Sequence, residues 1–232
     1  MILYTLFLAA VAFVGLLIEP TGRLYMRIAR HFWGRVVLGI GGVKVKVHAK
    51  DDVDWKKTYI VCANHSSQMD IPALFATLEM PVRFLAKRSL FLIPIFGWSM
   101  FLARFIPVDR AGGKKAALAL NNIVAKLKKG PSVIIFPEGT RSSDGVLKTF
   151  KSGAFVMAIK SGVPILPVAI KGSFDVLPKD TLLIKSGIID VIIGDPIETA
   201  FLKDTDRHDL SRRVKDSISC MLSEKYSTKR TV

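Results

Sequence analysis

Cysteine is scarce in this 232-residue chain, which contains only Cys62 and Cys220. Two such cysteines support neither the disulfide framework of a small secreted domain nor a cysteine-based zinc site, and we expect no metal. The sequence also lacks internal repeats and a GxSxG motif, which argues against lipases or thioesterases of the α/β-hydrolase type. The chain is 50% apolar, enough to bury the core of one globular domain with an appendage.

Acidic residues are in the minority. The chain has 34 Lys and Arg against 19 Asp and Glu, so its formal net charge is +15. A surface of this sign favours nucleic acid, an anionic membrane face or phosphorylated metabolites. A nucleic-acid-binding protein would interleave aromatic and basic residues on a platform or carry a recognition helix. Neither pattern is evident, so we expect no nucleic-acid partner, and a membrane-tethered nucleic-acid-binding protein is the remote alternative.

The first 18 residues contain no charged side chain. As a helix they would measure roughly 27 Å, just short of the hydrocarbon core of a bilayer. The run has neither the basic start nor the cleavage site of a secretory signal, so we expect it to be retained. Residues 19–42 then combine arginines at helical spacing with apolar residues, as an interfacial helix does. We therefore predict two membrane-associating helices over residues 1–42, which either span the membrane or dip into one leaflet. In both cases we expect the remaining chain to lie on the cytoplasmic side.

From residue 43 onward, strand and helix patterns alternate. The expected strands span residues 43–50, 58–63, 83–87, 105–108, 132–137, 165–171 and 188–193. The expected helices span residues 71–79, 114–128, 152–161 and 206–225. This alternation predicts an α/β domain over residues 43–232, with a mixed, largely parallel sheet flanked by helices.

The stretch CANHSSQMDIP places His65 and Asp70 just after an expected strand. Positions five apart point about 140° away from each other on a continuous helix, so these side chains can meet only if the chain bends between them. The intervening residues have poor strand character, and Asp70 followed by Pro72 is typical of a helix start. With such a bend, Asp70 would accept the Nδ1 proton of His65 and leave Nε2 as an oriented base. The alternative is that Asp70 only caps the helix while His65 completes a turn.

A second motif, FPEGTRS, comes at the end of another expected strand. Glu138 and Arg141 thus emerge at a strand end, where open α/β sheets bind ligands. Arg141 suits bidentate binding of a phosphate, and Gly139 allows the backbone to approach a ligand closely. Two further strands end in basic residues, Arg110 in FIPVDR and Lys87 in RFLAKR. Each alone is typical of a solvated strand end, whereas four such ends on one sheet edge indicate an anion-binding site.

In this order, NHSSQMD, FIPVDR, FPEGTRS and VPILPVAI resemble the four sequence blocks of the glycerolipid acyltransferases, specifically the 1-acyl-sn-glycerol-3-phosphate acyltransferases. The resemblance covers about residues 65–170, and the apolar N-terminus is similar to that of bacterial members. One departure is the valine before the Asp-Arg pair of FIPVDR, where many members have isoleucine. The resemblance implies that His65 and Asp70 are catalytic. It also implies that the acceptor and its phosphate are held by Glu138, Gly139, Thr140, Arg141, Arg110 and Lys87.

The implied reaction moves a fatty acyl group from an acyl-CoA or acyl carrier protein thioester to the sn-2 hydroxyl of 1-acyl-sn-glycerol 3-phosphate (lysophosphatidic acid), forming phosphatidic acid in phospholipid biosynthesis. His65 would remove the hydroxyl proton, with no covalent intermediate, cofactor or metal. Backbone amides after His65 or at the helix start are candidate donors to the oxyanion. Expected partners are lysophosphatidic acid, the thioester and an anionic phospholipid membrane, with a bacterial-type inner-membrane location.

Two alternatives stay within acyl-transfer chemistry. The acceptor could instead be glycerol 3-phosphate or another lysophospholipid, since local motifs do not encode the shape of the pocket. A covalent route is the other alternative, because Cys62 lies three residues before His65 and Ser66 lies beside it. It is disfavoured because a thiol in a buried strand is usually inert.

Overall fold

The computed structural model describes residues 32–49, 53–94, 96–102, 104–108, 123–125, 127, 130–224, 226 and 230–232. Within these residues the chain forms an eight-stranded sheet with the order β4-β3-β5-β2-β6-β7-β1-β8. The strands are β1 (Val43–Ala49), β2 (Ile60–Ala63), β3 (Val82–Lys87), β4 (Ile106–Val108), β5 (Ser132–Ile135), β6 (Ile165–Lys171), β7 (Gly187–Ile193) and β8 (Arg230–Thr231).

The sheet is mixed and largely parallel, as the sequence predicts. β6 and β7 pair antiparallel, and so do β1 and the short strand β8. The five other strand pairs are parallel. Parallel neighbours need crossover connections, and helices provide several of them. The described helices are α3 (Gly34–Ile40), α4 (Asp70–Thr77), α5 (Phe96–Leu102), α7 (Gly153–Ser161), α8 (Ser173–Val176) and α9 (Arg207–Ser223), with 3-10 turns η2 (Arg88–Leu92) and η3 (Asp204–Asp206).

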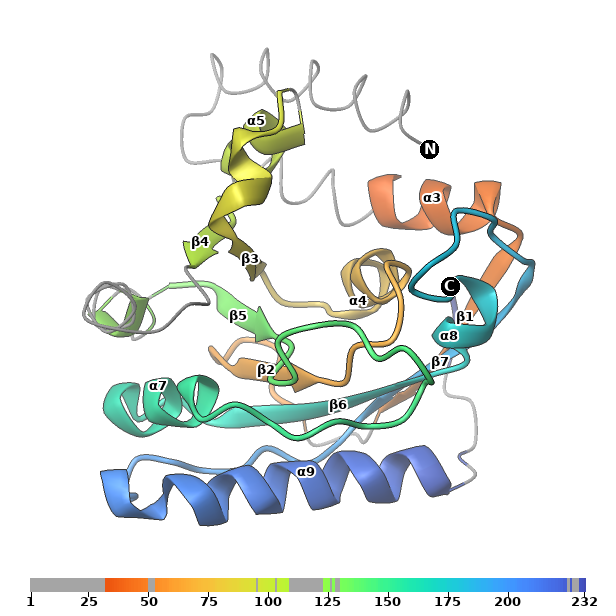
Figure 1. The fold of residues 1–232 in the computed structure, drawn as a ribbon. Coiled ribbons are helices and arrows are strands. Elements are labelled where there is room, and N and C mark those ends of the chain that lie inside the picture. The colour runs from red at the N-terminus through yellow and green to blue at the C-terminus, as the bar shows by residue number, and fades with distance from the viewer. Residues whose placement is uncertain are drawn as a thin grey trace.

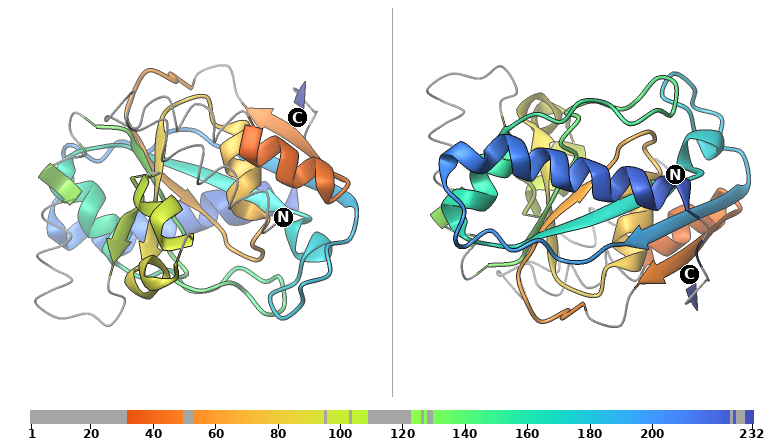
Figure 2. Two further views of the ribbon diagram at one scale, coloured as in Figure 1. Left: turned by 90° about the horizontal axis from the view of Figure 1, so that it is seen from above. Right: turned by 90° about the horizontal axis from the view of Figure 1, so that it is seen from below.

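Helices cover both faces of the sheet (Figure 1). α3 and α4 lie on one face, and α7 and α9 lie on the other. Figure 2 shows α9 running across the second face when the molecule is seen from below. Two buried apolar clusters fill these layers, one on each face. The central strands β2 and β5 are therefore buried on both sides, which explains why their sequences, IVCA and SVII, are nearly continuous apolar runs.

Each predicted element that the structure fully describes begins and ends within two residues of the observed one. The pattern reading missed α5, α8 and β8, because each is short and none has a clear apolar period. Of the helix expected over residues 114–128, the structure describes residues 123–125 and 127, which are helical. Most of the membrane-associating unit expected over residues 1–42 lies outside the described residues.

The described end of that unit belongs to the α/β fold. Val37 and Leu38 of α3 are buried in the core cluster. Gly34 lies so close to α4 that a Cβ there would come within 2.9 Å of the Pro72 carbonyl oxygen. α3 is thus packed against α4 as part of the domain. Among the described residues, no helix has both the length and the apolar character needed to cross a bilayer.

Candidate active site

The two sequence motifs meet because their strands are neighbours. β2 pairs with β5 in parallel, with Cys62 opposite Ile135. The carboxyl ends of parallel strands lie at the same edge of a sheet, so the residues that follow each strand emerge side by side. His65 follows β2 and Glu138 follows β5 at this edge. Strand order therefore brings together residues that are 73 positions apart in the chain.

His65 and Asp70 are in direct contact. The chain bends after β2, and α4 begins at Asp70 itself. The His65 Nδ1 and Asp70 Oδ2 atoms are 2.7 Å apart. Asp70 is fully buried, whereas the His65 side chain is 14% exposed. The structure thus makes the predicted contact between the two side chains, and it leaves the His65 ring accessible at one edge.

Backbone amides hold the Asp70 carboxylate in place. Its Oδ2 atom also accepts hydrogen bonds of 2.9 Å from the backbone N–H groups of Ser66 and Ser67. Its Oδ1 atom is buried and has no hydrogen-bond partner among the described residues. The two amides that directly follow His65 are therefore committed to Asp70, and they do not serve as the oxyanion donors that the sequence suggested.

An aromatic ring fixes the plane of the His65 imidazole. Phe136 stacks on it, with ring centroids 3.9 Å apart and an interplanar angle of 13°. With Nδ1 held by Asp70 and one face held by Phe136, the ring can rotate little. No hydrogen bond to Nε2 is found within the described part of the chain. Sequence reasoning did not predict that Phe136 packs on His65. Its position directly before the PEGTR residues is a signal that could have indicated a place in the site.

Glu138 supports the backbone around His65. Its Oε1 atom accepts the His65 N–H at 2.7 Å, and its Oε2 atom accepts the Lys148 N–H at 3.1 Å. Burial raises the pKa of this carboxyl group, and the two backbone hydrogen bonds partly offset the rise. The His65 carbonyl in turn accepts the N–H of Ser142 at 2.8 Å. One oxygen of Glu138 thus holds the His65 loop and the other holds the backbone at Lys148, so a direct contact with the acceptor stays a prediction.

The remaining residues of the second motif, Gly139, Thr140 and Arg141, follow Glu138 in the same loop. Gly139 has a φ of +78°, and a Cβ there would come within 2.9 Å of the Lys151 side chain. Glycine is therefore required at this turn for its backbone conformation. Thr140 is exposed and Arg141 is half-buried. The Nζ of Lys148 donates to the Arg141 carbonyl at 3.2 Å, which adds a second cation beside Arg141.

Of the two other predicted phosphate-binding residues, the structure describes Lys87 and not Arg110. Lys87 is exposed at the end of β3 and is separated from β2 by the intervening strand β5. The parallel pairing of β3 with β5 places Lys87 on the same sheet edge as His65. Arg110 lies outside the described residues, so its placement at the site stays a prediction.

Polar residues on both sides of His65 attach the loop to neighbouring elements. The Asn64 side chain makes two hydrogen bonds with the backbone of Ile170, which tie the end of β2 to β6. Ser66 Oγ bonds to Ser173 Oγ at 2.9 Å. Ser67 Oγ donates to the Leu177 carbonyl at 2.8 Å. Sequence reasoning assigned no anchoring role to Asn64, Ser66 or Ser67, although a polar run directly after a buried strand is a signal of such anchoring.

Cys62 is unsuited to a covalent mechanism. It is fully buried inside β2, and this burial raises the pKa of its thiol to about 12. Almost no thiolate exists at neutral pH under these conditions. The described residues also contain no group of three or more His, Cys, Asp or Glu side chains that could hold a metal ion. The contact between His65 and Asp70 is a geometry that can perform proton transfer at His65 Nε2.

A family model described as Acyltransferase matches residues 44–171 of the chain, which include both motifs. The chain belongs to the acyltransferase family. The resemblance predicted from the four sequence blocks is thus confirmed. The solved structure of the 1-acyl-sn-glycerophosphate acyltransferase from Thermotoga maritima is similar to this chain, with a TM-score of 0.77 and 27% identity, covering 97% of this chain and 91% of that one.

Curated relatives of this chain are named as 1-acyl-sn-glycerol-3-phosphate acyltransferases. A chloroplast 1-acyl-sn-glycerol-3-phosphate acyltransferase of Arabidopsis thaliana is 33% identical over 78% of this chain and 51% of its own length. Proteins of that name from Borreliella burgdorferi and Escherichia coli are 30% and 29% identical over 79% and 86% of this chain, and 74% and 80% of their own lengths. The chain spans about half the length of the plant relative and most of the bacterial ones.

Proposed function

We propose that this protein transfers a fatty acyl group from an acyl thioester to the sn-2 hydroxyl of 1-acyl-sn-glycerol 3-phosphate, forming phosphatidic acid. The single observation that carries the proposal is the buried contact between Asp70 and His65 in a member of the acyltransferase family. The names of relatives from plants and bacteria support lysophosphatidic acid as the acceptor.

In the mechanism, the Nε2 atom of His65 takes the proton of the acceptor hydroxyl as its oxygen attacks the thioester carbonyl. A hydroxyl is a weak nucleophile at neutral pH, so removal of this proton is the main chemical task. Asp70 accepts the Nδ1 proton, which fixes the tautomer with a basic Nε2, and its charge stabilises the imidazolium that forms. The proton then passes to the thiolate that leaves. No covalent enzyme intermediate is required.

The acceptor phosphate is held by the cations near His65. Arg141 lies three residues after Glu138 in the same loop, and its planar guanidinium is suited to binding two phosphate oxygens. Lys87 at the end of β3 and Arg110 are the further candidates for this contact. Fixing the phosphate places the sn-2 hydroxyl within reach of His65 and makes a bimolecular step effectively intramolecular.

The test is acyl transfer by purified full-length protein in phospholipid vesicles, comparing lysophosphatidic acid with glycerol 3-phosphate and with lysophosphatidylcholine. We expect phosphatidic acid as the main product. We also expect Arg141→Ala to raise KM for lysophosphatidic acid by roughly tenfold or more, because a charge-assisted phosphate contact is lost.

Arg213→Ala, which removes an exposed arginine from α9, is the matched control and should leave KM unchanged. Faster acylation of glycerol 3-phosphate would reassign the acceptor. Absence of transfer to any acceptor would refute the proposed reaction.

We also propose that the face carrying α3 and α5 rests on an anionic lipid surface. Trp98 on α5 is 65% exposed, and Leu182 in the loop before β7 is 93% exposed. α3 and α5 lie on the same side of the sheet (Figure 1). The loop that carries Leu182 approaches the end of α3, since a Cβ at Gly41 would come within 3.0 Å of Ile184. Exposed basic residues of this face, among them Arg35 and Lys185, complement lipid phosphates.

The double substitution Trp98→Asp with Leu182→Asp is expected to weaken binding to vesicles of phosphatidylglycerol and phosphatidylcholine by roughly tenfold or more, because two apolar contacts are replaced by negative charges. Co-sedimentation with vesicles measures the effect. Phe201→Asp is the control, since Phe201 is 95% exposed but lies in the loop before α9, which covers the opposite face of the sheet. Equal binding by both variants would contradict the assigned face.

A further inference from the structure

The Asp70 carboxylate is held through one oxygen. Its Oδ2 atom contacts His65 Nδ1 and accepts the N–H groups of Ser66 and Ser67. Its Oδ1 atom is buried and has no partner among the described residues. Within this part of the chain no hydrogen bond to Oδ1 prevents the carboxylate from turning, so its orientation depends on where the two amides lie. The backbone of Ser66 and Ser67 thus sets the geometry of the His65–Asp70 pair.

The hydroxyl groups of the same two serines are bound by residues 172–177, which contain α8 and are called the α8 segment below. Ser66 Oγ and Ser173 Oγ are 2.9 Å apart, and Ser67 Oγ donates to the Leu177 carbonyl at 2.8 Å. All three serine side chains are buried. Ser66 and Ser67 thus each place an N–H on the carboxylate of Asp70 and a hydroxyl on the α8 segment.

The α8 segment is itself fixed to the sheet and the core. Gly172 has a φ of +84°, and a Cβ there would overlap the carbonyl oxygen of Ile188, so the turn into α8 requires glycine. Val176 and Leu177 are buried in the core cluster. The Val176 carbonyl also accepts the N–H of Lys185 at 2.9 Å. The segment therefore offers the two serines a fixed attachment.

Only one of the two attachments ends on a side chain of the α8 segment. Ser67 bonds to a backbone carbonyl, which no substitution at Leu177 removes. Ser66 bonds to the hydroxyl of Ser173, and this is the one hydrogen bond of Ser66 Oγ among the described residues. The attachment of Ser66 therefore depends on the identity of residue 173.

We propose that Ser173 is a positioning residue for acyl transfer, which acts through Ser66 and Asp70 on the Nε2 atom of His65. The inference rests on the proposed function and adds to it a residue outside the four sequence blocks, 107 positions from Ser66 in the chain. A displacement of about 1 Å at a reacting group can cost about a hundredfold in rate. Loss of the Ser173 hydroxyl should therefore act on kcat.

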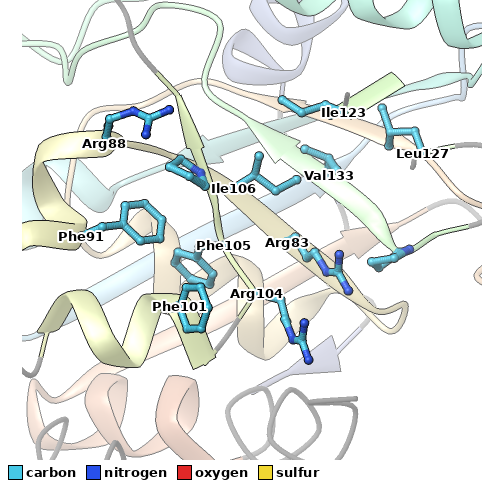
Figure 3. A pocket seen from close by; sticks show the side chains of 12 residues that line it. Arg83, Arg88, Phe91, Phe101, Arg104, Phe105, Ile106, Ile123, Leu127 and Val133 are labelled. Atoms are coloured by element: carbon cyan, nitrogen blue, oxygen red, sulfur yellow. The ribbon is translucent and has the colours of Figure 1, made fainter. Parts of the chain in front are cut away.

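The substrate-binding side of the sheet lies away from this attachment. The α8 segment follows β6, which borders β2 on one side, whereas Arg141 follows β5, which borders β2 on the other. Beyond β5, along β3 and β4, lies a cavity of about 390 Å³ whose lining includes Arg83, Arg88 and Arg104, called the Arg83 pocket below (Figure 3). A substitution at Ser173 leaves these cationic groups in place, so we expect little effect on KM.

Ser173→Ala is expected to lower kcat roughly tenfold, with KM for lysophosphatidic acid unchanged within about twofold. Single-turnover acyl transfer by purified full-length protein in phospholipid vesicles measures the effect. The variant should also lose a few degrees in Tm, because Ser66 Oγ is left buried without a partner. Ser161→Ala is the matched control, since it removes another buried serine hydroxyl at the end of α7 and should leave kcat unchanged.

A double variant separates positioning from folding. Replacing both partners of a buried hydrogen bond by apolar groups can be nearly neutral, so Ser66→Ala/Ser173→Ala should regain much of the Tm that Ser173→Ala loses. Its kcat should stay low, because the attachment of the loop is still missing. A role in stability alone predicts instead that kcat recovers together with Tm. The double variant also decides the question if Ser173→Ala alone does not fold.

A spectroscopic signal reports on the same geometry without any turnover. The proton between His65 Nδ1 and Asp70 should give a downfield ¹H resonance of the full-length protein in detergent, assigned by its absence in His65→Ala. We expect this proton to exchange with water faster in Ser173→Ala than in the parent protein or in Ser161→Ala.

Three results would overturn the inference. They are a folded Ser173→Ala protein with the kcat of the parent, a rise in KM in place of a fall in kcat, and recovery of kcat with Tm in the double variant. If the parent transfers no acyl group but the proton exchange changes as expected, the proposed function fails and the positioning role is supported. If the exchange is unchanged as well, both fail. The two failures are therefore distinguishable.

Discussion

Replacing His65 with alanine is expected to lower kcat for acyl transfer by about 10²- to 10⁴-fold, the usual contribution of a positioned general base. The effect should appear in kcat because the base acts in the transition state, whereas the phosphate of the acceptor is held by other residues. Single-turnover measurement of phosphatidic acid formation, with acyl-CoA and lysophosphatidic acid both saturating, gives the number.

The control must separate chemistry from folding, since His65 also stacks on Phe136. Thermal unfolding of the variant should show a change in Tm of only a few degrees, because the His65 side chain is at the edge of the core. His208→Ala removes an exposed histidine from α9 and should retain full activity. Full activity of a folded His65→Ala protein would contradict the role of His65 as the base and would show that its contact with Asp70 only stabilises the turn.

Asp70→Asn is expected to lower kcat by roughly 10²-fold or more with KM nearly unchanged. The amides of Ser66 and Ser67 point at the Oδ2 position, so the asparagine oxygen should occupy it and continue to accept their protons. The His65 ring then keeps its orientation but loses the negative charge that stabilises its protonated form. Comparison of kcat and KM with those of the parent enzyme measures this electrostatic contribution.

A stability measurement and a double variant complete this experiment. The asparagine NH₂ would lie at the Oδ1 position, which is buried and lacks a partner among the described residues, at a cost of about 1–3 kcal/mol in unfolding free energy. The His65→Ala/Asp70→Asn protein should be no slower than His65→Ala alone, because the aspartate acts through the histidine. Additive losses would show that Asp70 contributes separately from His65.

The contact between His65 and Asp70 could be predicted from local sequence patterns. His65 and Asp70 are only five residues apart, and the end of an apolar run followed by a helix-start signal indicates the bend that joins them. The strand that precedes FPEGTRS could also be predicted, because it is a short apolar run that ends at polar residues. The structural role of Glu138 could not be predicted, because a carboxylate that accepts two backbone N–H groups looks the same in sequence as one that binds a substrate.

The tertiary contacts depend on strand order, which periodicity does not encode. β2 and β5 have similar apolar runs, and either could pair with several other strands on pattern alone. Their adjacency in the fold is what places Glu138 and Phe136 against His65. The pairing of β3 with β5 likewise places the Arg83 pocket at the sheet edge beyond them.

The sequence by itself determined the α/β class, the approximate elements and the contact between His65 and Asp70, because these depend on short-range periodicity and on spacing within one loop. The tertiary structure decided which amides hold Asp70, which residues clamp His65, and where arginines and phenylalanines gather into a second pocket. The amides that hold Asp70 lie only three and four residues before it, whereas the Glu138–His65 contact and the pocket join residues tens of positions apart. They arise from the packing of the whole sheet and its helices, in which each strand's neighbours are selected by burial on both faces and not by any local signal.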